Sequence, residues 1–304
     1  MTGHGDWRSQ PERGSPRLLR LMLWLSRRLG RRLSRLALYP IALYFFLFAP
    51  SARRASHAYL ARALNRPART IDVLRHFLTF ASTIHDRVYL LDNPTGAITI
   101  DCPHGSLFDA PTGAILIGAH LGSFEALRAI GKGKAQRRVS MLMHADNAKK
   151  INALLAIANP AAADDIIVLG QVDSMLTAQT RLAEGHLIGM LADRSLPGDT
   201  LRLCPFLGTP AGFALGPFRV AALLRQPVYF MAGLYLGGNR YRVHFEPLAD
   251  FTHTDRPDRT RAIHRAQDRY VALLESHCRA YPYNWFNFYD FWAPPIAPNP
   301  EPAA

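Results

Sequence analysis

The sequence predicts an α/β fold in which helices flank a mainly parallel mixed sheet, preceded by an N-terminal amphipathic and hydrophobic helical segment that associates with a membrane. Short apolar runs alternate with helical stretches from residue 96 onward, and strands that alternate with helices form parallel sheets covered on both faces. The positive charge lies almost entirely before Asp72. We therefore expect an α/β domain over residues 96–293 and a separate basic segment before it.

The net charge of the chain belongs to its N-terminal segment. The formal charge of the 304 residues is +13, and thirteen arginines but no acidic residue lie between Arg13 and Ile71. Apolar residues make up 49 % of the sequence and charged residues 19 %, which excludes a wholly disordered protein. The chain after Ile71 is nearly neutral, as expected for an ordinary α/β domain.

Residues 18–50 are predicted to associate with a membrane. Between residues 18 and 35, leucines and arginines occupy separate stripes at helical spacing. The uncharged run 36–49 then reaches only roughly 21 Å at about 1.5 Å per residue, short of a hydrocarbon core of roughly 30 Å, and Pro40 interrupts it. We expect an anchor on an anionic membrane surface; a buried core helix, a secretory signal and a spanning helix are the alternatives.

The other segments are assigned from composition and pattern. Residues 1–17 form a basic tail, residues 51–95 form a helical lead-in with a helix over 72–91, and the Pro-rich tail 294–304 is expected to be loose. Nucleic acid is not expected as a partner, because it would explain the arginines but not the adjoining apolar run. Neither a disulfide framework nor a zinc site is predicted from the widely spaced Cys102, Cys204 and Cys278, and a reducing compartment is expected.

Within the domain, the elements follow in a regular order. Four apolar runs predict buried strands, at residues 114–119, 139–143, 166–169 and 187–192. The stretches between them predict helices, at residues 123–131, 147–158 and 173–184. The runs 227–234 and 241–245 flank Gly237-Gly238-Asn239-Arg240 and predict a hairpin, and a helix over 258–280 follows. A site is expected beyond the carboxyl ends of the parallel strands.

His120 is the sharpest candidate for a catalytic residue, because it directly follows the first apolar run. Glu125 lies five residues later, which on an ideal helix is a rotation of about 500°, so the two side chains meet only if His120 stands at the strand end and Glu125 in the first helical turn. Such a pair predicts a histidine base oriented by a carboxylate. A structural histidine in a turn is the alternative. The same spacing recurs in His104–Asp109 and His253–Asp258, neither of which follows a strand.

Residues 114–128 resemble the His-x4-Asp/Glu block of the glycerolipid acyltransferase superfamily, and most closely its late lipid A biosynthesis (lauroyl/myristoyl-type) branch. Residues 189–194 and 206–211 resemble two further blocks in the same order, and the likeness extends over residues 15–292. It implies transfer of a fatty acyl group from a thioester of acyl carrier protein to a hydroxyl of a membrane lipid or glycolipid. It also implies a peripheral or monotopic protein on the cytoplasmic face of the inner membrane, with no cofactor and no metal.

The resemblance also implies roles for individual residues. His120 would accept the proton of the acceptor hydroxyl and Glu125 would hold its imidazole, whereas Ser123 is expected to begin a helix rather than act as a nucleophile, since no Gly-x-Ser-x-Gly motif is present. Arg194 would bind the phosphopantetheine of the donor or stabilise the oxyanion; an ion pair with Asp193 or Asp199 is the alternative. The expected substrate-binding residues are Asp193, Arg194, Phe206, Gly208, Asn284 and Trp285.

Two departures from the branch put the acceptor in question. Eight of the twelve residues 281–292 are aromatic where the branch usually ends in a basic segment, and the stretch 157–161 lacks the arginine often found there. The aromatic segment is either a hydrophobic closure of the sheet or a wall for the acceptor, with Asn284 and Asn287 as polar contacts. Acceptors of the lipid A type, related envelope lipids, aminolipids and polyene-type lipids therefore stay open.

Two other functions are weighed against acyl transfer. One is a non-catalytic membrane adaptor that keeps an acyltransferase-like fold. The other is a metal-dependent phosphohydrolase built on His85-Asp86, a dipeptide expected instead to be an exposed pair on a helix.

Overall fold

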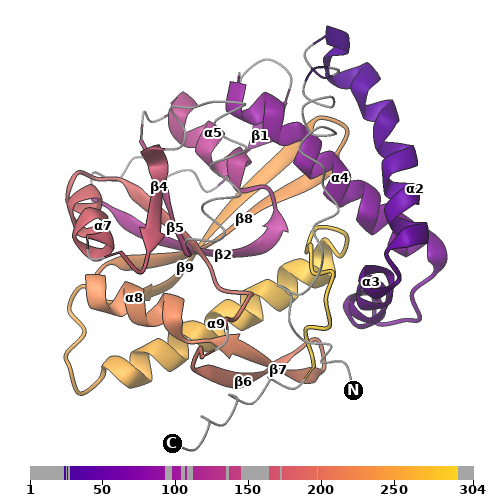
Figure 1. The fold of residues 1–304 in the computed structure, drawn as a ribbon. Coiled ribbons are helices and arrows are strands. Elements are labelled where there is room, and N and C mark those ends of the chain that lie inside the picture. The colour runs from indigo at the N-terminus through magenta and orange to yellow at the C-terminus, as the bar shows by residue number, and fades with distance from the viewer. Residues whose placement is uncertain are drawn as a thin grey trace, which may run out of the picture.

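The computed structural model gives the arrangement of most of the chain (Figure 1). It describes residues 24, 26, 28–92, 98–103, 107, 112–134, 137–144, 164–171, 173–196 and 198–293. Several predicted features lie outside these residues: the basic tail 1–17, the pair His104–Asp109, the helix 147–158, the stretch 157–161 and the tail 294–304.

A seven-stranded sheet forms the centre of the molecule, in the order β1-β9-β8-β2-β5-β3-β4. Its neighbouring strands pair in parallel except β8 and β9, which form the predicted antiparallel hairpin. The predicted mainly parallel mixed sheet is therefore confirmed. The strands are β1 (Thr99–Asp101), β2 (Ala114–Gly122), β3 (Val139–His144), β4 (Ile166–Leu169), β5 (Leu187–Leu191), β8 (Pro227–Gly237) and β9 (Arg240–Asp250).

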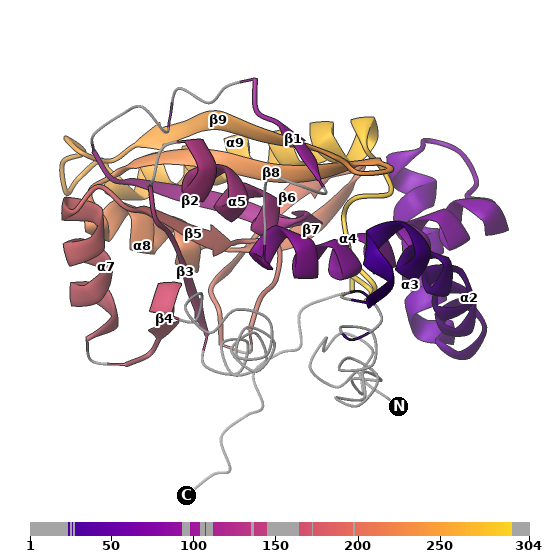
Figure 2. The ribbon, with the colours of Figure 1, turned by 90° about the horizontal axis from the view of Figure 1, so that it is seen from above.

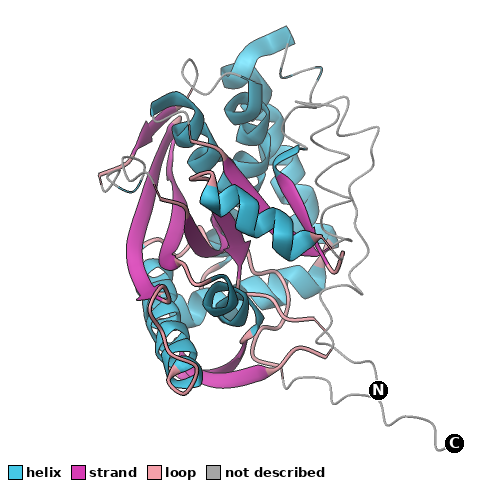
Figure 3. Ribbon diagram, turned by 90° about the vertical axis from the view of Figure 1, so that its left-hand side faces the viewer, coloured by secondary structure: helices cyan, strands magenta, loops and turns pink. Residues whose placement is uncertain are grey.

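Helices cover both faces of this sheet, as Figure 3 shows. Along β2, Ile115 and Ile117 pack into the cluster that includes α7, α8 and α9, whereas Leu116 packs against α5 and the end of α4. Burial on both faces explains why β2 reads as a continuous apolar run rather than an alternating one. The helices of the domain are α5 (Phe124–Lys134), α7 (Ser174–Ala183), α8 (Gly216–Leu224) and α9 (Arg259–Ala280).

One hairpin and one edge strand were not predicted. β6 (Leu201–Phe206) and β7 (Thr209–Ala214) form a separate two-stranded hairpin, and β1 is a three-residue strand at the sheet edge. Their side chains are partly exposed, so neither element forms the apolar run by which the other strands were recognised.

The N-terminal helices lie together at one end of the molecule (Figure 2). They are η2 (Arg35–Ala37), α2 (Leu38–Phe48), α3 (Pro50–Ala63) and α4 (Thr70–Asp92). Among the described residues, no single helix has both the length and the apolar composition needed to cross a membrane. The helical stretch Arg28–Phe48 and α3 meet that test only as a pair, and the two are bent by 97°.

A buried ion pair fastens the N-terminal helical segment, residues Arg28–Phe48, to the rest of the protein. Asp86 of α4 is fully buried and accepts hydrogen bonds from Arg31 at 2.8 and 2.7 Å and from the Tyr241 hydroxyl at 2.9 Å. Burial alone would raise the pKa of Asp86, but hydrogen bonds from His85 and Arg31 hold it below its usual value. The expectation of an exposed His85-Asp86 pair is wrong, because arginines from the N-terminal segment cover and neutralise the carboxylate.

We predict that Asp86→Ala destabilises the protein by about 3 kcal/mol or more, because it leaves the buried guanidinium of Arg31 without its partner carboxylate. The free energy of unfolding, measured by denaturant titration in detergent, checks this. Asp255→Ala removes an exposed carboxylate and is expected to change stability by less than about 0.5 kcal/mol. Equal effects of the two substitutions would show that the ion pair contributes nothing.

Candidate active site

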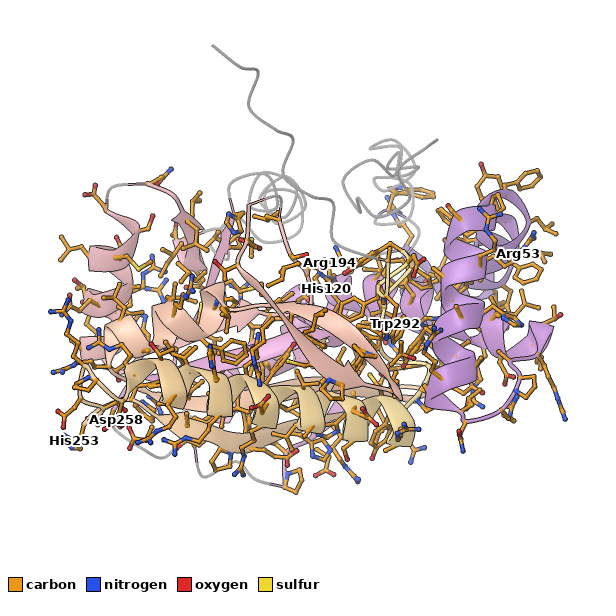
Figure 4. All side chains as sticks on the ribbon, turned by 90° about the horizontal axis from the view of Figure 1, so that it is seen from below. Arg53, His120, Arg194, His253, Asp258 and Trp292 are labelled. Atoms are coloured by element: carbon orange, nitrogen blue, oxygen red, sulfur yellow. The ribbon has the colours of Figure 1, made fainter. Side chains whose placement is uncertain are left out.

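His120 lies near the carboxyl end of β2, where strand hands over to helix as the sequence predicted. The strand runs to Gly122, three residues further than the apolar run indicated, and α5 begins at Phe124. Glu125 stands in the first turn of α5. Figure 4 shows His120 beside Arg194 and far from the exposed residues His253 and Asp258. The pair His253–Asp258, which has the same spacing in sequence, is therefore remote from this edge of the sheet.

The carboxylate that binds His120 is Asp193, in the loop after β5. One oxygen of Asp193 lies 2.9 Å from Nδ1 of His120, and the other accepts the backbone N–H of His120 at 2.9 Å. The register explains the meeting, because β5 pairs in parallel with β2 and ends beside Gly118. A carboxylate at Nδ1 fixes the tautomer in which Nδ1 carries the proton, so Nε2 has the free lone pair of a base.

The electrostatic surroundings keep this base neutral near pH 7. Burial is the main reason that the pKa of His120 falls below 6.5; the charge of Arg194 lowers it further, and Asp193 opposes both. Burial alone would raise the pKa of Asp193, but His120 and Arg194 outweigh it and lower the pKa to about 2. The site therefore holds an ionised carboxylate against an unprotonated imidazole.

Glu125, expected to hold the imidazole, has other partners in the structure. Its carboxylate accepts a hydrogen bond from the Ser123 hydroxyl at 3.2 Å and forms an ion pair with Arg87 of α4, with 3.2 Å between Nε and Oε1. The backbone N–H of Ser123 is bonded to Gly233, and its hydroxyl is directed to Glu125. The structure thus brings Glu125 to the same strand-to-helix turn as His120 but gives the contact at Nδ1 to Asp193.

The aromatic segment 281–292 closes the site from the side. Beyond Gly118, where β5 ends, the segment pairs with the edge of β2: Phe286 donates to the carbonyl of His120 at 2.8 Å, and Gly122 donates to Asn284 at 2.9 Å. Trp285 is fully buried and donates its indole N–H to Asp193 at 2.8 Å. The segment therefore both closes the sheet and holds the carboxylate that orients His120.

The two asparagines of this segment differ. The amide of Asn284 bonds the backbone of Tyr235 on β8 in both directions, at 2.7 and 3.2 Å, which accounts for its burial. Asn287 is also buried, yet its side-chain nitrogen and oxygen have no hydrogen-bond partner among the described residues. Buried amides without partners are rare, so the described contacts of the fold do not account for the burial of Asn287.

Close backbone packing explains the glycine in His120-Leu-Gly-Ser. Gly122 has φ +73°, and a Cβ there would lie 1.9 Å from the carbonyl oxygen of Gly233 on β8. A Cβ on Gly233 would in turn lie 2.0 Å from the carbonyl oxygen of Ser123. Only glycine allows β2 and β8 to approach this closely, and that approach fixes where His120 lies.

The block 206–211 forms the turn between β6 and β7. Leu207 and Gly208 both have positive φ, at 50° and 82°, which is the geometry of a tight hairpin turn. Phe206 is fully buried, with its ring centroid 5.3 Å from that of Trp285. Phe206 therefore lies behind Trp285, and Gly208 lies exposed at the turn.

Among the described residues, one group of side chains could hold a metal ion. The ligand atoms of His244, Glu246 and His277 lie within 4.8 Å of one another, between β9 and α9. Nε2 of His277 is 2.8 Å from Glu246, so the same residues form an ion pair when His277 is protonated. The wide separation of His277 from the other two in sequence explains why spacing did not reveal this group.

These features define an α/β protein with a histidine base, held by a carboxylate, at the carboxyl edge of a parallel sheet. Residues 106–293, more than half of the chain, match the family model for bacterial lipid A biosynthesis acyltransferases. The chain belongs to this family, as the three sequence blocks indicated. Membership of this family indicates that the protein is an acyltransferase of the lipid A type. A comparison with curated proteins found no match.

We predict opposite shifts of the His120 pKa in two variants. Arg194→Gln removes a nearby positive charge and is expected to raise the pKa of His120, whereas Asp193→Asn removes the opposing negative charge and is expected to lower it. Imidazole titration by NMR measures both, with the resonance assigned by its loss in His120→Ala. A pKa that moves in neither variant would contradict the electrostatic account of the site.

Proposed function

We propose that the protein transfers a fatty acyl group from an acyl thioester, carried by acyl carrier protein, to a hydroxyl of a lipid A-like or related envelope lipid. The observation that carries the proposal is the His120–Asp193 pair, which leaves Nε2 as a base in a member of this family. The carboxylate at Nδ1 orients the ring, and a pKa below 6.5 leaves the imidazole unprotonated at neutral pH.

In the proposed reaction, Nε2 of His120 accepts the proton of the acceptor hydroxyl while its oxygen attacks the thioester carbonyl. The carbonyl oxygen becomes an oxyanion, and Arg194, whose charge acts on His120, is proposed to stabilise it. Collapse of the tetrahedral intermediate breaks the carbon–sulfur bond, and the imidazolium returns its proton to the departing thiolate. No acyl-enzyme is formed, so Ser123 needs no role as a nucleophile.

The remaining site residues receive narrower roles. Asp193 orients the ring and stabilises the imidazolium, and we propose that Glu125 adds negative charge that favours the same cation. Trp285 donates to Asp193 and Phe206 packs against Trp285, so we propose that the two rings shape the substrate site from behind the reacting groups. Asn287 is proposed to contact the acyl chain carbonyl or the acceptor, since its buried amide needs a partner.

Membrane association is the second part of the proposal. Exposed apolar side chains follow one another along the N-terminal helical segment, although Leu38 and Ala42 of the same segment are buried against the domain. A water-exposed apolar face of this size is typical of a membrane or protein contact. The exposed residues are Leu29, Leu33, Leu36, Tyr39, Leu43, Tyr44, Leu47 and Phe48. They would hold the protein, by peripheral or monotopic attachment, to the cytoplasmic face of the inner membrane.

We predict that His120→Ala lowers the rate of acyl transfer about 10²-fold or more, the usual contribution of a general base. The rate is measured as acyl incorporation from an acyl carrier protein thioester into membrane lipids of a strain lacking the protein, and mass spectrometry of the product identifies the acceptor. Asp193→Asn is expected to cause a comparable loss, and the exposed His253→Ala none. Full activity of His120→Ala would show that His120 is not the base, absence of transfer by the unaltered protein would favour a non-catalytic adaptor, and a product of another lipid class would replace the proposed acceptor.

The membrane contact has its own test. Replacing Leu43, Leu47 and Phe48 together by Ser is expected to move the protein from the membrane to the soluble fraction, because these three side chains are about half exposed and contribute little to the core. Fractionation of cells measures the shift. The matched control replaces Leu176, Leu203 and Leu223, which are somewhat more exposed but lie on the α/β domain, and should leave the distribution unchanged. Release of both triple variants would mean that the N-terminal segment is not the anchor.

A further inference from the structure

A basic pocket lies between the N-terminal helical segment, α4 and the turn that joins β8 to β9. It has a volume of about 580 Å³. Arg31, Arg32 and Arg35 supply its basic wall, Ser82 comes from α4, and Gly238 comes from the turn. None of these residues takes part in the proposed acyl transfer.

The charge of this pocket fits a phosphate group. Three guanidinium groups line it, none of its described lining residues is acidic, and the one carboxylate beneath them is the buried Asp86. After that carboxylate is paired, an excess of two positive charges remains, the charge that a phosphomonoester or a pair of phosphodiesters would neutralise. The excess is uncompensated by any acid in the pocket wall that the structure describes.

Two of the arginines are already held in position. Arg31 makes two hydrogen bonds to Asp86 and is 9 % exposed at its side chain, and Arg35 donates to Ser82 at 3.1 Å and lies over the ring of Tyr235. Side chains held this way lose little further freedom when an anion binds. Arg32, on the same turn, is exposed and can close on the ligand. The pocket is therefore largely preorganised.

The apolar part of the lining distinguishes a lipid from a free anion. Leu36, Leu38 and Tyr39 line the same pocket as the arginines, and the exposed apolar face of α2 continues from them. A soluble phosphate would use only the basic wall. A lipid would place its phosphate on the arginines and its acyl chains along Leu36 and Tyr39.

The pocket opens at the edge of the sheet that carries His120. β8 runs parallel to β2 and pairs Gly233 with Gly122, so Gly238 lies five residues, or about 16 Å, further in the direction in which β2 points toward the site. α4 joins the two places, since Asp86 faces the pocket and the adjacent Arg87 faces Glu125. A membrane lipid bound in the pocket would therefore hold the edge of the sheet that carries His120 close to the membrane surface.

We propose that this pocket binds the phosphate of an anionic membrane lipid, as a defined site rather than as diffuse surface charge. The proposal rests on the membrane association proposed above, but it does not depend on acyl transfer. Arg32 is the residue through which it is tested, because it lines the pocket and its side chain is exposed.

The test compares Arg32→Ala with Arg54→Ala in the full-length protein. Both remove one exposed arginine of the N-terminal half, but Arg54 lies on α3 and does not line the pocket. Binding is measured by co-sedimentation with phosphatidylcholine vesicles that do or do not contain phosphatidic acid. We expect Arg32→Ala to weaken binding to the anionic vesicles about tenfold or more, as for loss of a charge-assisted hydrogen bond, and Arg54→Ala to weaken it less than about fivefold.

Equal losses in the two variants would overturn the proposal, because they would show that the arginines act only as diffuse charge. A short-chain phosphatidic acid and inorganic phosphate are then titrated separately against the detergent-solubilised protein by calorimetry. Saturable binding of the short-chain lipid that Arg32→Ala weakens supports the site, whereas equally tight binding of inorganic phosphate would assign the pocket to a free anion. Retained binding of Arg32→Ala to neutral vesicles would leave membrane association intact even where the pocket proposal fails.

Discussion

The buried carboxylate of Asp193 is the interaction on which the site depends. Taking a carboxylate out of water costs several kcal/mol unless donors surround it, and here the donors are the backbone and ring of His120 and the indole of Trp285. The donors come from two parts of the chain: the end of β2 and the C-terminal aromatic segment both meet the loop after β5. The same contacts that offset the cost of burial also fix the tautomer of the imidazole. The contacts that fold this edge of the sheet therefore also orient the imidazole of His120 as a base.

A second dependence runs through α4. Asp86 and Arg87 are neighbours on this helix, but Asp86 is paired with Arg31 of the N-terminal segment and Arg87 with Glu125 beside His120. The helix therefore connects the apolar, arginine-rich segment to the strand-to-helix turn of the site. Part of the charge of the basic segment is therefore neutralised inside the protein, where Arg31 and Arg35 pair with the buried Asp86. The remaining positive charge faces the pocket and solvent.

The sequence was sufficient for the longer strands of the sheet and for the position of His120, because strands buried on both faces leave continuous apolar runs and His120 directly follows one. The short, exposed edge strand β1 left no such run. The sequence could not identify the partner of His120. Asp193 lies 73 residues further along the chain, and only the parallel pairing of β5 with β2 brings it near, whereas Glu125 was favoured because it was close in sequence. The resemblance had marked Asp193 as a site residue without its contact. The exposed pair expected at His85-Asp86 failed for a related reason: the arginines that bury it lie about fifty residues upstream.

The aromatic segment 281–292 has a structural role and, in the proposed mechanism, a functional one. Trp285 is fully buried, as a hydrophobic closure requires, yet its indole N–H is one of the donors that hold Asp193. Asn284 is explained by its bonds to Tyr235, whereas the buried amide of Asn287 is not explained by any described contact. A segment that closes the sheet can therefore also limit which acceptor enters, because it is bonded to His120 and Asp193 and carries buried polar groups, on Asn287 and Trp292, that have no partner among the described residues. Differences in this segment are where acceptor preference within the family would be expected to arise.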